Sequence, residues 1–242
     1  FESFTIESTN GIVADYYRSY YNVIFRANLV LDKLDAASPE KKAAFAAEAK
    51  FLRAYAYFNL VRLFGDVPLV AGLISPLDTE TAFTRVSSSL VYDFIVSDLQ
   101  DAVANLSDGG ANDQASKAAA EGILAKVYLT LGRYSEAQTL LESIMSPSRG
   151  FSLENDFKDV FYNEGNNEVL FAIGYVPSSN DDSQNFSAEW LNAVGRTSGV
   201  NYVSMDAKAF LDTHGGNRTA LSYREDAAQA GKYQVEIGRA HV

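Results

Sequence analysis

Apolar residues recur at helical spacing along the first part of the chain. Over residues 16–34 they return every three or four positions, with Asn28 as the polar exception in the apolar stripe. A second stretch follows Ser38, the expected N-cap, and has Pro39 at the first helical position, where its missing N–H costs nothing. The pattern predicts two helices, the second over residues 39–64.

The second predicted helix carries apolar side chains in nearly every direction around its axis. Such a pattern is typical of a central helix with neighbours on several sides. Its apolar residues are Phe51, Leu52, Tyr55, Tyr57, Phe58, Leu60, Val61, Leu63 and Phe64. We expect the helix to end at Gly65, which accepts a left-handed conformation, and a loop to follow to about Arg85.

Three further helices are predicted before residue 146. One is capped by Ser87, Ser88 or Ser89 and reaches Leu106, with its polar face formed by Asp93, Ser97, Asp98 and Asp101. The other two, over 116–131 and 134–145, are joined only by Gly132 and Arg133, so we expect an antiparallel hairpin.

Beyond residue 146 the composition shifts toward Ser, Asn, Gly and Asp. The short apolar run 168–173 favours a buried strand, 176–185 a loop, and 203–211 a short helix. We therefore predict a mainly α protein with a helical scaffold over 1–146 and a loop-rich, partly irregular portion over 147–235. Residues 236–242 resemble a translated sequencing adapter, and we expect the chain to be a fragment of a longer protein.

Charge and composition narrow the possible functions. The chain has 31 acidic and 20 basic residues, a net charge of −11, and no cysteine. A negative summed field makes nucleic acid a poor partner, and the absence of cysteine excludes disulfides and thiolate chemistry. No run approaches the about 20 apolar residues that a spanning helix needs. No cofactor or metal motif is present, and we expect neither.

The sequence gives little support to the hypothesis that the protein is an enzyme. A Ser/His/Asp set would have to be built around His214, which we interpret as a turn histidine. A carboxylate pair for glycoside hydrolysis could draw on Glu189, Asp206 and Asp212, but acidic residues are abundant enough to supply such pairs by chance. Residues 164–168 offer oxygen atoms without the spacing of a calcium loop and are predicted to be a turn.

Carbohydrate binding needs exposed aromatic rings flanked by side chains that bond to hydroxyl groups. The best local match surrounds the only tryptophan and comprises Trp190, Asn192, Arg196, Asn201 and Tyr202. Trp190 could equally anchor its loop to the core, so both interpretations stay open. The helical spacing of Tyr16, Tyr17, Tyr20 and Tyr21 favours core packing. Arg53 and Arg62 are expected to pair with buried or interfacial acceptors such as Glu48.

Two motifs carry a resemblance to known proteins. Leu124, Ala125, Tyr128, Leu131, Gly132, Tyr134, Ala137 and Leu141 are spaced as in a tetratricopeptide-type hairpin. The stretch 48–70 resembles the signature of the SusD/RagB family of outer-membrane nutrient-binding lipoproteins. Its signature residues, expected to be structural, are Glu48, Phe51, Leu52, Arg53, Ala54, Tyr57, Leu60, Phe64, Gly65, Asp66 and Pro68.

The SusD/RagB resemblance extends over nearly all of residues 16–234, and it implies both a fold and a function. The implied fold is a tetratricopeptide-like scaffold with an irregular C-terminal portion that carries much of the ligand surface. The implied function is non-catalytic oligosaccharide binding at the bacterial surface and delivery to a SusC-like TonB-dependent transporter. The resemblance places the lipid anchor outside this sequence. The alternative from the hairpin alone is an intracellular tetratricopeptide-like scaffold for protein partners.

Overall fold

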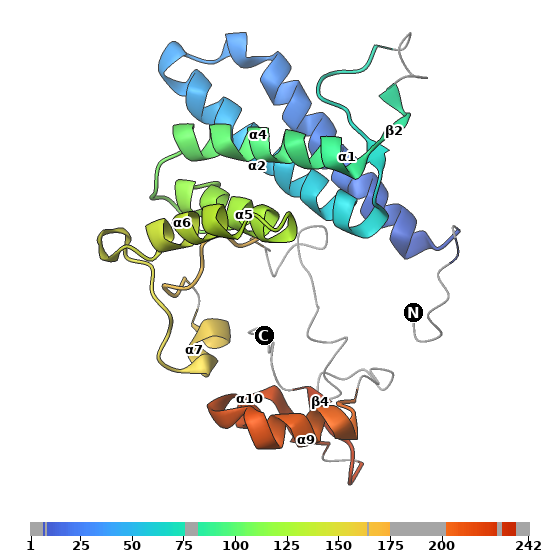
Figure 1. Cartoon of the computed structure of the whole chain (residues 1–242), viewed down its shortest axis with the longest axis vertical. Helices are drawn as coiled ribbons and strands as arrows, with labels where there is room; N and C mark the ends of the chain where they lie inside the picture. The colour runs from blue at the N-terminus through green and yellow to red at the C-terminus, as the bar shows by residue number, and fades with distance from the viewer. Residues whose placement is uncertain are drawn as a thin grey trace. The chain divides into compact units, whose positions relative to one another are not determined.

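The computed structural model describes residues 7, 9–75, 82–163, 165–174, 202–226 and 229–235. The chain divides into two compact units, Phe1–Gly150 and Phe151–Val242. The first unit is built from helices, and Figure 1 shows α1 and α2 side by side with α4 lying across α2. Each unit has its own internal packing and is described by itself.

The first two helices follow the predicted pattern closely. Helix α1 spans Gly11–Asp32 and starts earlier than predicted, because the Asn10 side chain accepts a hydrogen bond from the Val13 amide and caps it. After a single 3-10 turn, η1 (Leu34–Ala36), helix α2 spans Pro39–Phe64. Ser38 occupies the predicted N-cap position, but its hydroxyl donates to the Glu40 carboxylate and does not cap the helix amides.

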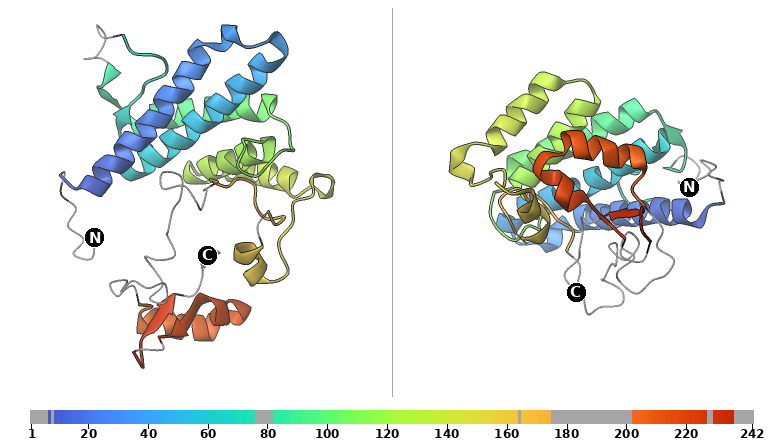
Figure 2. Two further views of the ribbon diagram at one scale, coloured as in Figure 1. Left: turned by 180° about the vertical axis from the view of Figure 1, so that it is seen from behind. Right: turned by 90° about the horizontal axis from the view of Figure 1, so that it is seen from below.

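Helix α2 is the centre of the first unit. Phe51, Ala54, Tyr57 and Leu60 are fully buried along it, and α1, α4 and α5 all contact it. The views in Figure 2 show the same arrangement from behind and from below. Burial on several sides confirms the prediction of a central helix.

A small two-stranded sheet closes the segment between α2 and α4. Strand β1 (Val67–Pro68) pairs antiparallel with β2 (Arg85–Val86), and α4 (Ser88–Asn105) follows directly. The Asp66 carboxylate accepts a hydrogen bond of 2.7 Å from the Ser88 amide at the start of α4. The two ends of the predicted loop are therefore held together beside the central helix.

The predicted hairpin of two helices is confirmed in its bounds. Helix α5 spans Lys117–Thr130 and α6 spans Tyr134–Ile144, followed by the 3-10 turn η2 (Pro147–Arg149). Ala125 and Ala137 are almost fully buried in these helices, which contact each other closely. Small residues at a close helix contact are consistent with a tetratricopeptide-like hairpin.

The second unit combines short helices with one hairpin. Its helices are α7 (Phe157–Tyr162), α9 (Met205–His214), the 3-10 turn η4 (Gly216–Arg218) and α10 (Thr219–Ser222), and strands β3 (Tyr223–Glu225) and β4 (Tyr233–Val235) pair antiparallel. Helix α9 confirms the short helix predicted over 203–211.

The buried strand predicted over 168–173 is wrong. These residues adopt turn and irregular backbone, none of them is fully buried, and Ile173 is 56% exposed. Within the described ranges no strand pairs with this run, and an apolar run without a partner strand has no ladder to satisfy its backbone groups.

In the described part of the chain, no helix is both long and apolar enough to cross a membrane.

Gly65, the one glycine in the sequence of the signature segment 48–70, is expected to be sensitive to substitution. Its φ of 68° and ψ of −126° lie in a region that is essentially restricted to glycine. A Cβ atom there would meet nothing within 4 Å, so the cost of Gly65→Ala would be backbone strain alone. We expect a loss of about 1–3 kcal/mol in the free energy of unfolding, measured by chemical denaturation.

Gly11→Ala is the matched control for this substitution. Gly11 is the first residue of α1, has no positive φ, and also has open space at its Cβ position. Alanine there is expected to leave stability unchanged or to raise it by up to about 1 kcal/mol. Equal losses for both variants would contradict the assignment of strain to Gly65.

Candidate functional site

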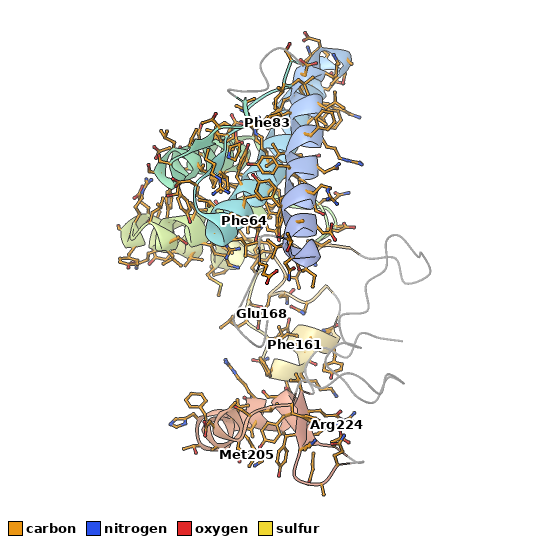
Figure 3. The ribbon with its side chains drawn as sticks, turned by 90° about the vertical axis from the view of Figure 1, so that its right-hand side faces the viewer. Phe64, Phe83, Phe161, Glu168, Met205 and Arg224 are labelled. Carbon is orange, nitrogen blue, oxygen red and sulfur yellow. The ribbon has the colours of Figure 1, made fainter. Side chains whose placement is uncertain are left out.

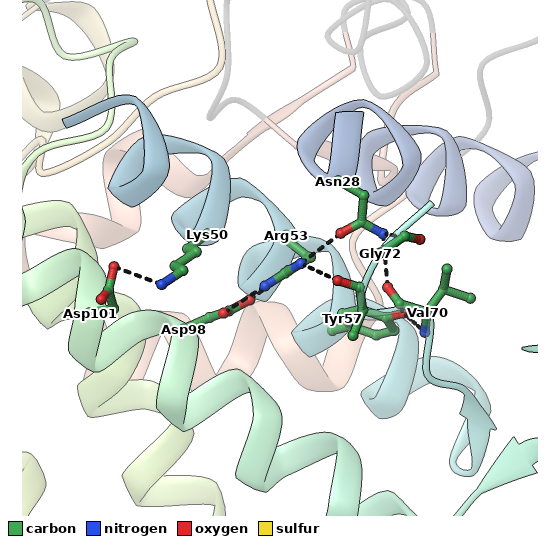
Figure 4. Close-up of polar contacts among 9 residues, drawn as sticks. Asn28, Lys50, Arg53, Tyr57, Val70, Gly72, Asp98 and Asp101 are labelled. Carbon is green, nitrogen blue, oxygen red and sulfur yellow. Dashed lines mark hydrogen bonds and ion pairs between the residues drawn. The ribbon is translucent and has the colours of Figure 1, made fainter. Parts of the chain in front are cut away.

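A buried ion pair lies between the central helix and α4. Arg53 of α2 donates from Nε to Oδ2 of Asp98 at 2.8 Å and from Nη2 to Oδ1 at 2.9 Å (Figure 4). The two side chains are only 6% and 5% exposed. This two-point contact is the strong geometry for a guanidinium and a carboxylate, and it ties α2 to α4.

The remaining nitrogen of the Arg53 guanidinium, Nη1, contacts α1 and the segment after β1. Nη1 donates to Asn28 Oδ1 at 2.6 Å and to the Ala71 carbonyl at 3.0 Å. Asn28 in turn donates to the carbonyls of Val70 and Gly72 at 3.0 and 3.2 Å. Side chains from three helices thus meet at this node, and two of them bond directly to the backbone of residues 70–72 (Figure 4).

Two tyrosines complete the contacts to this segment. The Tyr57 hydroxyl accepts a hydrogen bond of 2.6 Å from the Val70 amide, and the Tyr21 hydroxyl donates to the Pro68 carbonyl at 2.7 Å. Burial raises the pKa of Tyr57 to about 12, and burial also raises the pKa of Tyr21. The path of residues 67–72 is therefore set by side chains of α1 and α2.

Two predictions about this region are wrong. Asp98 was predicted on the polar face of its helix, but it is 4% exposed and pairs with Arg53. Glu48, the predicted partner for the arginines, is exposed, although the expectation of a buried acceptor for Arg53 is confirmed. Burial raises the pKa of Asp98 and the Arg53 guanidinium opposes that rise. In the sequence, the polar Asn28 within an otherwise apolar stripe was the one signal that could have indicated this buried polar cluster.

The other signature residues mostly lie in or beside this packed region. Phe64 packs its ring edge-on against Tyr17, with ring centroids 5.1 Å apart. Pro68 is buried in β1, whereas Leu52 is 41% exposed on α2. The aromatic pairs confirm core packing for Tyr17 and Tyr21, but the prediction is wrong for Tyr16, which is 54% exposed.

Of the five residues predicted to bind carbohydrate, Tyr202 is the one within the described ranges. Trp190, Asn192, Arg196 and Asn201 lie outside them, as does Glu189. Tyr202 forms an isolated bridge with Gln234 of β4, and its hydroxyl donates to Asp226 at 3.3 Å. The Lys232 ammonium lies 4.9 Å from its ring centroid.

A lysine holds helix α9 against the hairpin of β3 and β4. Lys208 lies 5.4 Å from the ring centroid of Tyr223 and 4.9 Å from that of Tyr233, and it pairs with Asp212 at 2.6 Å. The hydrogen bond with Asp212 raises the pKa of Lys208. The rings of Tyr223 and Tyr233 in the hairpin next to Tyr202 are therefore packed against the Lys208 ammonium of α9.

Two of the four candidate catalytic groups, His214 and Asp212, are engaged in other contacts. His214 ends α9, stacks on Phe210 at 4.7 Å, and places Nδ1 3.2 Å from the Phe210 carbonyl oxygen. Asp212 pairs with Lys208 and Tyr223. His214 is thus the last residue of a helix and not the turn residue we predicted. Among the described residues, no group of three or more His, Asp or Glu side chains is placed to hold a metal ion.

The sequence matches both a known family model and a curated relative. Residues 3–129 match the SusD-like family model described as "Starch-binding associating with outer membrane". SusD-like protein P2 of Formosa agariphila is 34% identical over 182 residues, which cover 72% of this chain and 36% of that protein. The chain thus spans about a third of the length of this curated relative.

Solved structures give the same result for the fold. A crystal structure with xylogluco-oligosaccharide has a TM-score of 0.78 at 24% identity, over 96% of this chain and 52% of that one. A laminarin-binding SusD-like protein has a TM-score of 0.76 at 25% identity, over 92% of this chain and 55% of that one. The arrangement of helices described above is the arrangement of these proteins.

Proposed function

The chain belongs to the SusD-like family, and from this premise we propose that the complete protein binds oligosaccharides without cleaving them. The observation that carries the proposal is the match of residues 3–129 to a family described as starch-binding. The similarity to a laminarin-binding protein and to a structure with xylogluco-oligosaccharide supports it further.

We place glycan recognition in the portion 147–235 and the structural scaffold in 1–146. The proposed ligand residues are Trp190, Asn192, Arg196, Asn201 and Tyr202. The surroundings of Tyr202 support this choice, because a half-buried ring beside Lys232 and Asp226 can offer both stacking and hydrogen bonds. The buried Arg53 node belongs to the scaffold in this proposal.

The proposal also includes a place in the cell and a partner. The family description associates its members with the outer membrane. We propose that the complete protein is lipid-anchored at the cell surface and delivers its glycan to a SusC-like TonB-dependent transporter. Co-purification of the complete protein with such a transporter from native membranes would support this, and recovery of the complete protein in the cytosolic fraction would favour the intracellular scaffold.

Tyr202→Ala is expected to weaken oligosaccharide binding by the complete protein about tenfold, the loss of one stacked aromatic contact. Isothermal titration calorimetry with laminarin, xyloglucan and maltose oligosaccharides would measure it. Tyr202→Phe keeps the ring and removes the bond to Asp226, so a smaller loss is expected. Trp190→Ala is expected to weaken oligosaccharide binding at least as much as Tyr202→Ala does.

The control for Tyr202→Ala is Tyr134→Ala, which removes a tyrosine that is 68% exposed on α6. Its affinity should equal that of the unchanged protein. An unaltered affinity in both the Tyr202 and the Trp190 variants would exclude the proposed site. Release of shorter sugars from any of these glycans would refute the non-catalytic assignment.

A further inference from the structure

Lys232 lies over the ring of Tyr202 because of the way in which strand β4 is paired. Tyr202 forms its bridge with Gln234, and the Val203 amide donates to the Tyr233 carbonyl at 2.7 Å. In an antiparallel pair, the residue two positions from the bridged partner is a diagonal neighbour on the same face. Lys232 therefore shares the face of Tyr202, and its ammonium lies over the ring, 4.9 Å from the centroid.

The turn before β4 fixes the backbone of Lys232. Its amide donates to the Gln229 carbonyl at 3.1 Å. Gly231 has a φ of 79°, and its amide donates to the Glu225 carboxylate at 2.7 Å. Figure 3 labels Arg224 on β3, the strand that leads into this turn. Lys232 is thus an exposed side chain on a hydrogen-bonded turn, next to a half-buried tyrosine ring.

Within the described ranges, no carboxylate forms an ion pair with the Lys232 ammonium. The two acidic residues of the hairpin bond to other groups. Asp226 accepts a hydrogen bond of 3.3 Å from the Tyr202 hydroxyl, and Glu225 accepts the one from the Gly231 amide. The ammonium is therefore placed by its contact with the ring. A cation over an exposed ring is held more weakly than a cation that bonds to a carboxylate.

Lys208 shows the other arrangement in the same unit. It also lies against tyrosine rings, but its ammonium pairs with the Asp212 carboxylate at 2.6 Å. The two lysines share the contact with aromatic rings and differ in the carboxylate partner that the described residues provide. An anionic ligand could take at Lys232 the place that Asp212 takes at Lys208.

The local charge around Lys232 permits an anionic ligand, although the whole chain is acidic. The chain has a net charge of −11, but residues 202–235 contain four basic and four acidic side chains. These are Lys208, Arg218, Arg224, Lys232, Asp206, Asp212, Glu225 and Asp226. At physiological ionic strength, exposed charges more than about 8 Å apart are largely screened from each other. The net charge of the chain therefore does not decide which charge a ligand meets at this hairpin.

We propose that Lys232 makes the glycan site specific for sugars that carry an anionic group, either a uronic acid carboxylate or a sulfate ester. This inference rests on the proposed glycan-binding function, with Tyr202 as a ligand residue, and names a substrate class for it. A sugar that stacks on the ring of Tyr202 displaces the Lys232 ammonium from it. An anionic sugar replaces the lost contact with a charge-assisted hydrogen bond, whereas a neutral sugar does not.

The test uses the complete protein with tetragalacturonate, its neutral methyl ester and a sulfated carrageenan tetrasaccharide. In isothermal titration calorimetry, Lys232→Gln is expected to weaken the binding of at least one of the two anionic ligands about tenfold. A loss for tetragalacturonate identifies a carboxylate as the recognised group, and a loss for the carrageenan identifies a sulfate. The same variant should bind the methyl ester about two- to fivefold more tightly, because the ammonium no longer covers the ring.

Opposite changes for an anionic and a neutral ligand cannot come from a loss of folding, which would weaken both. Lys158→Gln is the matched control, because Lys158 is an exposed lysine of the same unit whose ammonium lies 5.9 Å from the ring centroid of Tyr162. Its affinities should not change. Lys232→Arg, which keeps the positive charge, should retain most of the affinity for the anionic ligand.

Unchanged affinities in Lys232→Gln would overturn the inference, as would an equal loss for the anionic ligands and the ester. Binding of neutral glycans without any binding of either anionic ligand would overturn it too. These three results would leave the proposed glycan-binding function standing, whereas failure of every glycan to bind would reject both.

Discussion

Replacing Arg53 with methionine is expected to lower the free energy of unfolding of the N-terminal unit by about 3–5 kcal/mol. The substitution leaves the Asp98 carboxylate, whose side chain is 5% exposed, without its cation. It also removes the donors to Asn28 Oδ1 and to the Ala71 carbonyl. Urea denaturation followed by far-ultraviolet circular dichroism would measure the loss.

The loss in Arg53→Met should depend on pH in a defined direction. Burial already raises the pKa of Asp98, and without the arginine it should rise further above the unfolded value. A raised pKa in the folded state gives stability that is present at low pH and is lost as the pH rises through the folded value. The deficit should therefore be smaller near pH 4 than at pH 7.

The control is the double variant Arg53→Met with Asp98→Asn. It has no ionisable group at this position, so its deficit should not grow between pH 4 and pH 7, and it should be smaller than the sum of the two single losses. A single variant that loses less than about 1 kcal/mol would show that the node does not stabilise the fold.

Arg149→Met is expected to give the second large loss, about 3 kcal/mol. Arg149 donates from Nε and Nη2 to the Asp108 carboxylate at 2.7 and 2.9 Å and also pairs with Glu121, whose side chain is 4% exposed. The substitution would leave Glu121 buried without a cation and would free the turn η2 from α5. The same denaturation experiment would measure it.

Arg133→Met is the comparison for this second loss. Its pair with Glu136 lies on the surface, with side chains 39% and 48% exposed, and such solvent-screened pairs contribute little to stability, so Arg133→Met should lose much less than Arg149→Met. A similar loss for the Arg149 and Arg133 variants would contradict the view that burial, and not pairing as such, sets the energetic cost.

Several features of this protein could be predicted because they depend on residues close together in the chain. The ends of α2 follow from Pro39 and Gly65, and the hairpin of α5 and α6 follows from the short connection at Gly132. The apolar spacing along these helices predicted a mainly helical scaffold. The signature over 48–70 indicated the family, which the comparison of residues 3–129 confirmed.

Only the tertiary structure decided which polar groups are buried and what they bind. The periodicity of the sequence placed Asp98 on the polar face of its helix. Periodicity reports only the average polarity of a helix face, and it does not show that one cation on another helix lies opposite Asp98. Arg53 and Asp98 are 45 residues apart in the sequence, and Asn28 joins them from a third helix. The run 168–173 likewise had strand character but no partner strand among the described residues. Local spacing determines helices and turns, whereas ion pairs and strand pairing depend on which distant segments the fold brings together.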